Sequence, residues 1–225
     1  MQLTGSPTFK AIRWAVEEKH VHIISISFGF PNADKSLEPI RRAILEAHAA
    51  DVLIFAATGN KGKGDAIEFP ACLDEVISVG STDGEHKKSS FVPTKLGPGK
   101  RLCAIGEALE AAWIKPTTAD SNRIAHCTQQ RKAGTSYATP IAAGIAATIM
   151  DLIWSDRAEH SHQCQILRTN RGMMAVLERM VERGEGDTYD YLEPWKYLSA
   201  QFYADVEALG VHILGVLRTV YNPSL

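Results

Sequence analysis

The sequence has no excess of charge of either sign. Its 225 residues carry 24 lysines and arginines against 26 aspartates and glutamates, which gives a formal net charge of −2 at pH 7. Proteins that bind nucleic acid or anionic membranes through long-range electrostatics usually present a basic field. We therefore expect neither nucleic acid nor a membrane surface among the partners of this chain.

Cysteine is also scarce, with four residues in the whole chain. Their positions form neither a disulfide framework nor a Cys-x-x-Cys pair. The first residues, MQLTGSP, lack the basic and apolar regions of a secretory signal. We therefore expect free thiols in a reducing compartment and a cytoplasmic or otherwise intracellular protein. Secretion stays open if further sequence precedes residue 1.

Long uninterrupted apolar runs are absent. The longest run, from Ala138 to Ile153, contains threonine, proline and aspartate and is shorter than the ~20 residues that a membrane-spanning helix needs. We find no internal repeat and no low-complexity segment. With 45% hydrophobic and 22% charged residues, the composition is that of a globular domain with a sizeable core.

Apolar runs alternate with amphipathic segments along the first two thirds of the chain. This alternation favours an α/β fold, in which helices cover both faces of a parallel sheet in three layers. The polar stretch Glu107–Lys132 is interpreted as a loop. The expected helices are 8–19, 37–50, a long one from Ser136 to about Trp154, and 171–181; the expected strands are 21–28, 52–58, 76–82 and 102–105.

Residues 133–140 read AGTSYATP and stand out as a chemical motif. A Gly-Thr turn here precedes Ser136, and an alanine-rich run follows it. Pro140 is expected in the first turn of the helix, where a missing N–H has no intrahelical partner. A serine at a helix N-terminus lies where a developing negative charge is stabilised. The alternative is that Ser136 only caps a core helix.

This segment resembles the nucleophile motif of the subtilisin-like serine proteases, Gly-Thr-Ser-x-Ala-Thr/Ser-Pro. The resemblance implies that Ser136 is the catalytic nucleophile. Further segments are similar to the same family in the expected order, and together they extend from about Ile12 to Leu152. The fold that this resemblance implies is the three-layer subtilisin-like fold, incomplete at its N-terminal side.

The apolar run from Val52 ends in a Gly-Asn turn at Asn60. A buried parallel strand is expected here, and open parallel sheets build their sites at the carboxyl ends of strands. The segment resembles the one that supplies the side-chain donor of the oxyanion hole in the family. Losing such a donor costs about 2.7–4 kcal/mol of transition-state stabilisation. Taken without its context, the pair is better explained as an ordinary Gly-Asn turn; its position ahead of Ser136 favours the oxyanion role.

Two other segments resemble the substrate-binding parts of the family. The strand that ends in Ser27, Phe28 and Gly29 is similar to the one that pairs with the substrate backbone. On this resemblance we expect substrate binding at these residues and at Ala57 and Gly59.

Glu68 precedes a Phe-Pro pair that resembles the Tyr-Pro of the family. The alignment places Glu68 where subtilisins commonly carry a glycine at the base of the S1 pocket, so a preference for substrate lysine or arginine is expected. The alternative is that Glu68 points to solvent. The neighbouring stretch Lys61–Lys63 is interpreted as a solvated loop.

The sequence lacks the other half of the catalytic machinery of this family. Neither the Asp-x-Gly segment nor the His-Gly-Thr-His segment occurs in the 225 residues. A serine hydroxyl without a general base is a poor nucleophile at neutral pH. We therefore expect that this chain belongs to a serine endopeptidase but lacks the aspartate and the histidine of the catalytic triad. On this expectation the chain alone is inactive. The alternatives are a non-catalytic peptide-binding or regulatory module and an incomplete gene model.

Residues 1–155 are assigned to a partial catalytic domain and residues 156–225 to a helical extension of it. A Gly-Met helix from Gly172 and the Pro194-Trp195 pair resemble the tail of intracellular subtilases of filamentous fungi. The segment Ala200–Val220 is expected to pack on the domain or to bind a partner. Self-association through an exposed sheet edge is a further expectation. No metal ligand is assigned, although structural calcium is compatible with the family; Asp34, Glu38 and Asp65 were weighed for it and form no calcium-loop pattern.

Overall fold

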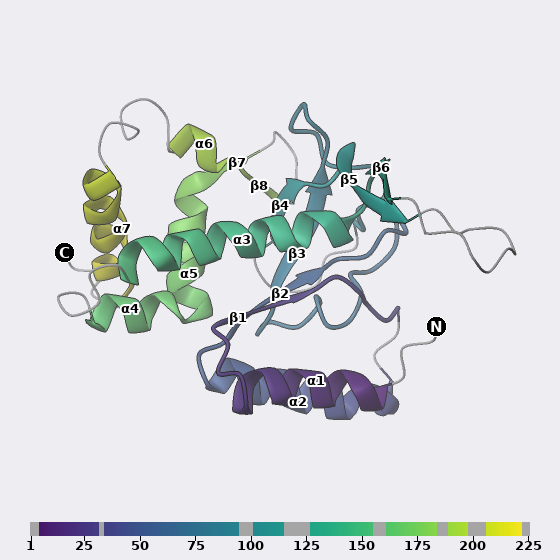
Figure 1. Ribbon diagram of the computed structural model, residues 1–225, viewed down its shortest axis with the longest axis horizontal. Helices are drawn as coiled ribbons and strands as arrows, with labels where there is room; N and C mark the ends of the chain where they lie inside the picture. Colours follow the sequence, from purple (N-terminus) through teal and green to yellow (C-terminus); the bar gives the residue numbers. More distant parts are fainter. Residues whose placement is uncertain are drawn as a thin grey trace, which may run out of the picture.

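The computed structural model describes residues 5–31, 34–94, 101–114, 127–154, 161–183, 189–197 and 206–221. Within these ranges, six strands form one sheet in the order β1-β2-β3-β4-β8-β7, and helices cover both of its faces (Figure 1). The α/β architecture with a parallel sheet between helical layers, which the sequence predicts, is confirmed.

The centre of the sheet consists of four parallel strands. Every residue of β2 and β3 is buried, as is typical of parallel strands covered on both faces. The expected strand 21–28 is shorter in the structure because only four of its residues pair with β2. The strands are β1 Ile23–Ile26, β2 Leu53–Ala57, β3 Ile77–Thr82 and β4 Arg101–Ile105.

One face of the sheet is covered by α1 (Gly5–Glu17) and α2 (Glu38–Ala49), which pack against each other. A short 3-10 helix, η1 (Lys35–Leu37), leads into α2. Figure 1 shows both helices below the strands. The core on this side joins apolar residues of the two helices to side chains of β1 and β2; it includes Ile12, Ile40, Ile44, Ala47, Ile54 and Ala56.

The opposite face is covered by α3 (Thr135–Trp154), which contacts all four central strands. Ala138, Ala142 and Ala146 have no exposed surface, so the helix axis lies close to the sheet. With 20 residues, α3 is long and apolar enough to cross a membrane, and the expectation that this run is too short to do so is wrong. Its contacts with the sheet identify it as a core helix.

Pro140 does not lie in the first turn of α3, contrary to the expectation from the sequence. The helix begins at Thr135, so Pro140 lies inside it. Proline has no N–H, and therefore the carbonyl of Ser136, four residues earlier, loses its intrahelical donor. The hydroxyl of Ser27 donates to that carbonyl at 2.9 Å instead.

The stretch 107–132 is not a plain loop, and that interpretation was wrong. It contains an antiparallel pair, β5 (Leu109–Ile114) and β6 (Cys127–Lys132), which forms a separate two-stranded sheet. Exposure alternates along residues 109–112, which is typical of a half-buried strand.

The segment after residue 155 adds strands as well as helices. β8 (Asp190–Leu192) pairs in parallel with β4, and β7 (Val181–Arg183) pairs antiparallel with β8. The expected helix 171–181 is shorter, because it ends at Leu177 and continues through a 3-10 turn into β7. The division at residue 155 stays a prediction. The helices are α4 Ser161–Leu167, α5 Asn170–Leu177, η2 Glu178–Met180, α6 Pro194–Tyr197 and α7 Val206–Tyr221.

Candidate active site

Ser136 is the second residue of α3, at the carboxyl ends of β1 and β2. The hydroxyl of Ser136 donates to the carbonyl of Ser27 at 2.9 Å, and the hydroxyl of Ser27 donates to the carbonyl of Ser136 at 2.9 Å. These two bonds join the nucleophile helix to the segment that follows β1. The N-terminal end of the helix dipole lies at the same place and stabilises negative charge there.

Asn60 lies beside the start of the same helix. Its Oδ1 accepts hydrogen bonds from the Thr135 backbone N at 2.9 Å and from the Thr135 hydroxyl at 3.1 Å. The backbone N–H can only donate, so the atom that faces it must be the amide oxygen. The Nδ2 group of Asn60 is consequently on the other side of the amide and remains able to donate to a ligand.

Glu68 lies between the ends of β1 and β2 rather than pointing into solvent. A Cβ built on Gly29 would lie 2.7 Å from Glu68 Oε2, and one built on Gly59 would lie 2.9 Å from Glu68 Cδ. A side chain at either position would collide with Glu68 as it lies here, and Gly59 also has a φ of 103°, which favours glycine. The side chain of Glu68 is 15% exposed, and Lys61 Nζ lies 3.4 Å from its Oε1.

The other residues expected to bind substrate lie at the same edge of the sheet but differ in accessibility. Ser27 is exposed, and Phe28 is half-buried with its ring 6.0 Å from that of Phe30. Ala57 ends β2 and is 3% exposed. Its side chain faces the core, so any substrate contact of Ala57 requires its backbone.

No histidine is recorded at the Ser136 hydroxyl in the part of the chain that the structure describes. His22 packs edge-on against Trp154, and His86 lies against Glu193. The base that activates a serine must lie within hydrogen-bonding reach of its hydroxyl. His126 and His160 lie outside the described residues.

The acidic residues weighed for calcium do not form a site. Asp34 Oδ1 accepts from the backbone N and the hydroxyl of Ser36, and these bonds hold the pKa of the Asp34 carboxyl below its usual value. Glu38 lies 3.8 Å from Arg41. The described residues contain a different group with metal-ligand atoms within 4.8 Å of one another: His86, Glu182 and Glu193.

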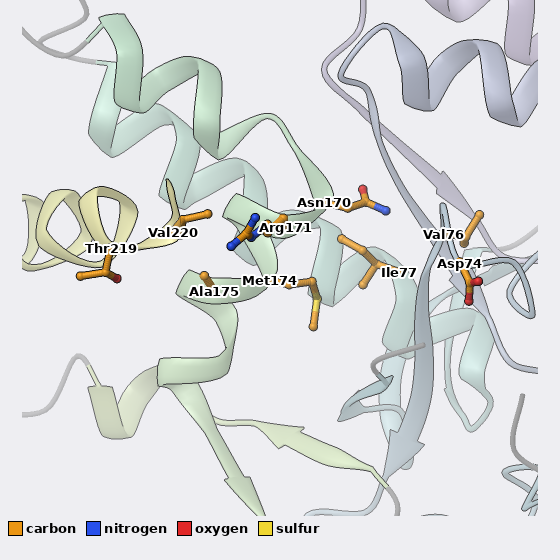
Figure 2. A pocket seen from close by; sticks show the side chains of 9 residues that line it. All are labelled: Asp74, Val76, Ile77, Asn170, Arg171, Met174, Ala175, Thr219 and Val220. Atoms are coloured by element: carbon orange, nitrogen blue, oxygen red, sulfur yellow. The ribbon is translucent and has the colours of Figure 1, made fainter. Parts of the chain in front are cut away.

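A pocket of about 450 Å³ lies far from this chemistry, between α5, α7 and the start of β3. Figure 2 shows the residues that line it, which include Arg171, Met174 and Ala175 of α5, Val220 of α7 and Ile77 of β3. Ile77 begins β3, so the pocket is at the amino end of that strand, whereas Ser136 lies at the carboxyl ends of β1 and β2. We do not assign the active site to this pocket.

Two residues of the site were missed in the sequence. Lys61 is not simply part of a solvated loop, because it pairs with Glu68. Thr135, which has no exposed surface, fixes the orientation of Asn60. Lys61 follows Asn60 and Thr135 precedes Ser136 in the sequence, and this adjacency could have predicted that both residues belong to the site.

Comparisons with known proteins identify the family of the chain. A family model described as the subtilase family matches residues 1–182. The subtilisin-like protease het-Q2 of Podospora anserina is 30% identical over 177 residues, which cover 77% of this chain and 44% of that protein. Subtilisin Savinase of Lederbergia lenta is 31% identical over 149 residues, 65% of this chain and 49% of that protein. The chain thus spans less than half the length of these two curated relatives.

Solved structures show the same fold. The prenylagaramide maturation protease PagA is similar with a TM-score of 0.60 and 24% identity, over 96% of this chain and 69% of that one. The patellamide maturation protease PatA gives a TM-score of 0.61 at 24% identity, over 96% and 71% of the two chains. Because the family model extends over most of the chain and includes the Ser136 segment, this protein belongs to the subtilase family.

Proposed function

We propose that this chain carries the nucleophile and the oxyanion donor of a subtilisin-like serine endopeptidase. In this proposal Ser136 attacks the scissile carbonyl and forms the acyl-enzyme. The Nδ2 group of Asn60 donates to the oxyanion, which the N-terminus of α3 also stabilises. Ser27, Phe28 and Gly29 lie where an extended substrate backbone would run beside the end of β1.

The observation that carries the proposal is the bond between Asn60 and Thr135. It joins residues 75 positions apart at 2.9 Å and holds the Asn60 amide next to Ser136. The bond satisfies one of the free N–H groups at the start of α3, and it also fixes the amide beside the residue that precedes Ser136. The capped amide also has its donor group available, as oxyanion stabilisation requires.

Turnover further requires a general base. The Ser136 hydroxyl donates to the Ser27 carbonyl, and a carbonyl oxygen does not remove the serine proton. The sequence contains no Asp-x-Gly and no His-Gly-Thr-His segment. We therefore propose that the histidine and the carboxylate for acyl transfer come from outside these 225 residues, or from a second chain.

The test is to label Ser136 with a fluorophosphonate probe in two proteins. One is the 225-residue chain, and the other is the product of the longest open reading frame that contains it. We expect the chain alone to react no faster than its Ser136→Ala variant. The longer product should react and hydrolyse peptides if it supplies the two segments, and lose both activities on Ser136→Ala. A longer product that contains both segments and stays unreactive would sink the proposal.

The second candidate is a peptide-binding module without catalysis. The reciprocal bonds between Ser27 and Ser136 favour it, because they occupy the hydroxyl with a carbonyl partner. A longest frame without the two missing segments, together with peptide binding by the 225-residue chain, would support this candidate.

We also propose self-association through β1. In the described residues β1 pairs only with β2, and apolar hollows flank it on both faces. One, of about 330 Å³, lies between α1 and β1, and the other, of about 380 Å³, lies between β1 and α3. An open strand edge beside apolar surface favours association. Intracellular location likewise remains a proposal; it is consistent with Cys72, Cys103 and Cys164, which are not joined in a disulfide.

A further inference from the structure

The backbone of Glu68 is fixed across the ends of two strands. The Glu68 N–H donates to the carbonyl of Thr58 at 3.0 Å, and the next residue, Phe69, exchanges two backbone hydrogen bonds with Phe30. Phe69 is 2% exposed. Because the backbone of Glu68 and that of its neighbour Phe69 are held in this way, the carboxylate has a defined position above the ends of β1 and β2.

That position is a narrow slot with glycine walls. The carboxylate of Glu68 occupies the space that a side chain at Gly29 or Gly59 would take. Gly59 precedes Asn60, and Gly29 follows Ser27 by two residues, or ~7 Å of extended backbone. The slot is therefore next to both the oxyanion donor and the carbonyl that holds Ser136.

The partner of this carboxylate comes from an exposed residue. Lys61 Nζ lies 3.4 Å from Glu68 Oε1, and its side chain is 48% exposed, against 15% for Glu68. An ion pair with an exposed lysine is weak, because it is hydrated and orders a flexible side chain. A ligand cation that entered the slot could replace it at little cost.

We infer that Glu68 selects substrates with arginine or lysine at P1, the residue whose carbonyl Ser136 attacks, and that Lys61 occupies the carboxylate until such a substrate displaces it. This inference rests on the proposed function and adds the substrate class. An arginine guanidinium is the better ligand, because it can form two parallel charge-assisted hydrogen bonds with a carboxylate.

The glycine walls support this selection in a second way. A carboxylate between two glycines leaves backbone, rather than apolar side chains, along the slot. A large apolar P1 side chain would have to cover the Glu68 carboxylate without supplying a donor, which costs the desolvation of a charged group. The slot therefore favours cations and disfavours phenylalanine or leucine.

The test measures binding rather than turnover, so it does not depend on a general base. Two acetylated tetrapeptides with C-terminal carboxylates, one ending in arginine and the other in citrulline, are titrated into the 225-residue chain by calorimetry. Citrulline has the size of arginine and no charge. The readout is the ratio of the two dissociation constants, citrulline over arginine, in which all contacts common to both peptides cancel.

We expect the native chain to bind the arginine peptide more tightly, by ~3-fold or more. Glu68→Gln should bring the ratio to about one, since the neutral amide keeps the size and loses the charge. Lys61→Met should raise the ratio to ~10 or more, because a competing cation is removed. Asp65→Asn, which removes a carboxylate from the same loop, should leave the ratio unchanged. Thermal unfolding of each variant checks that it is folded.

Three results would overturn the inference: equal binding of the two peptides in the native chain and in Lys61→Met, an unchanged ratio in Glu68→Gln, or no binding of either peptide. The outcome is separate from that of the proposed function. An unreactive Ser136 in the longer product, together with a charge-dependent ratio in this chain, would remove the catalytic assignment and keep the slot. A reactive Ser136 in the longer product, together with a ratio of one in this chain, would keep the catalytic assignment and remove the selection of cations by Glu68.

Discussion

Ser27 and Ser136 exchange hydroxyl-to-carbonyl hydrogen bonds of 2.9 Å across 109 positions of the chain. The bond that Ser27 donates replaces the one that Pro140 cannot make within α3. Pro140 inside α3 and Ser27 after β1 thus contribute to one hydrogen-bonded connection. It ties the nucleophile to the segment on which we place the substrate.

Ser27→Ala should loosen this connection without unfolding the protein. The Ser136 carbonyl would lose its side-chain donor, and because the pair is exposed, water would replace part of the bond. We expect a loss of about 0.5–1 kcal/mol in the free energy of unfolding, measured by urea denaturation. Ser90→Ala, another exposed serine in a loop, is the control and should be neutral. Equal effects of the two variants would contradict the tie.

Substitution of Asn60 separates its two roles. Asn60→Asp keeps an oxygen for the Thr135 N–H and removes the Nδ2 donor, whereas Asn60→Ala removes both. In a catalytically complete form, both variants should lower kcat by ~10²–10³-fold with a smaller change in KM. Only Asn60→Ala should also lose the cap of α3, typically ~1 kcal/mol of stability. An unchanged kcat in Asn60→Asp would exclude Asn60 as the oxyanion donor.

Helix α7 offers a test of whether the tail packs on the domain or awaits a partner. Leu217 has no exposed surface, whereas Val211 on the same helix is 65% exposed. Leu217→Ala should cost about 2–5 kcal/mol because α7 packs against α5, α4 and α3. Val211→Ala should have little effect. Chemical denaturation measures both, and a neutral Leu217→Ala would favour the partner-binding interpretation.

The open edge of β1 predicts association that depends on concentration. Ser25 is the exposed residue of this strand, and a charge there should oppose edge-to-edge pairing. We expect Ser25→Lys to shift the sedimentation of the chain towards monomer. Val211→Lys adds the same charge on α7 and should not. A native chain that sediments as a monomer at every concentration would refute the association.

Glu193 predicts a pH dependence of stability. Its side chain is 1% exposed, and burial raises the pKa of its carboxyl. The native state therefore keeps this proton above the unfolded pKa of about 4.3. Consequently the free energy of unfolding should fall as pH rises from there to the native pKa and stay level above it. Glu193→Gln, still beside His86, should remove this fall in denaturation series at successive pH values. Glu85→Gln is the exposed control, and an unaltered fall in Glu193→Gln would contradict the assignment.

The distribution of apolar residues along short stretches of sequence correctly predicted the buried strands and the core helix. The apolar runs before Thr58 and Thr82 are buried strands, and the alanine-rich run after Ser136 is a core helix. The β5–β6 pair was missed because β6 (CTQQRK) is polar and resembles a loop, so that the apolar β5 (LEAAWI) had no recognisable partner. It becomes a hairpin through pairing between its two halves, which no short window of sequence contains.

The sequence by itself determined the order of the four central strands and the helices between them, the helix that begins at the Ser136 segment and the resemblance that led to the family. The tertiary structure alone decided which segments meet. Sheet order and register place Ser27 against Ser136, Asn60 against Thr135, and Glu68 between Gly29 and Gly59. The physical reason is that periodicity and capping act over a few residues, whereas these contacts join backbone positions brought together only when the parallel strands align at their carboxyl ends.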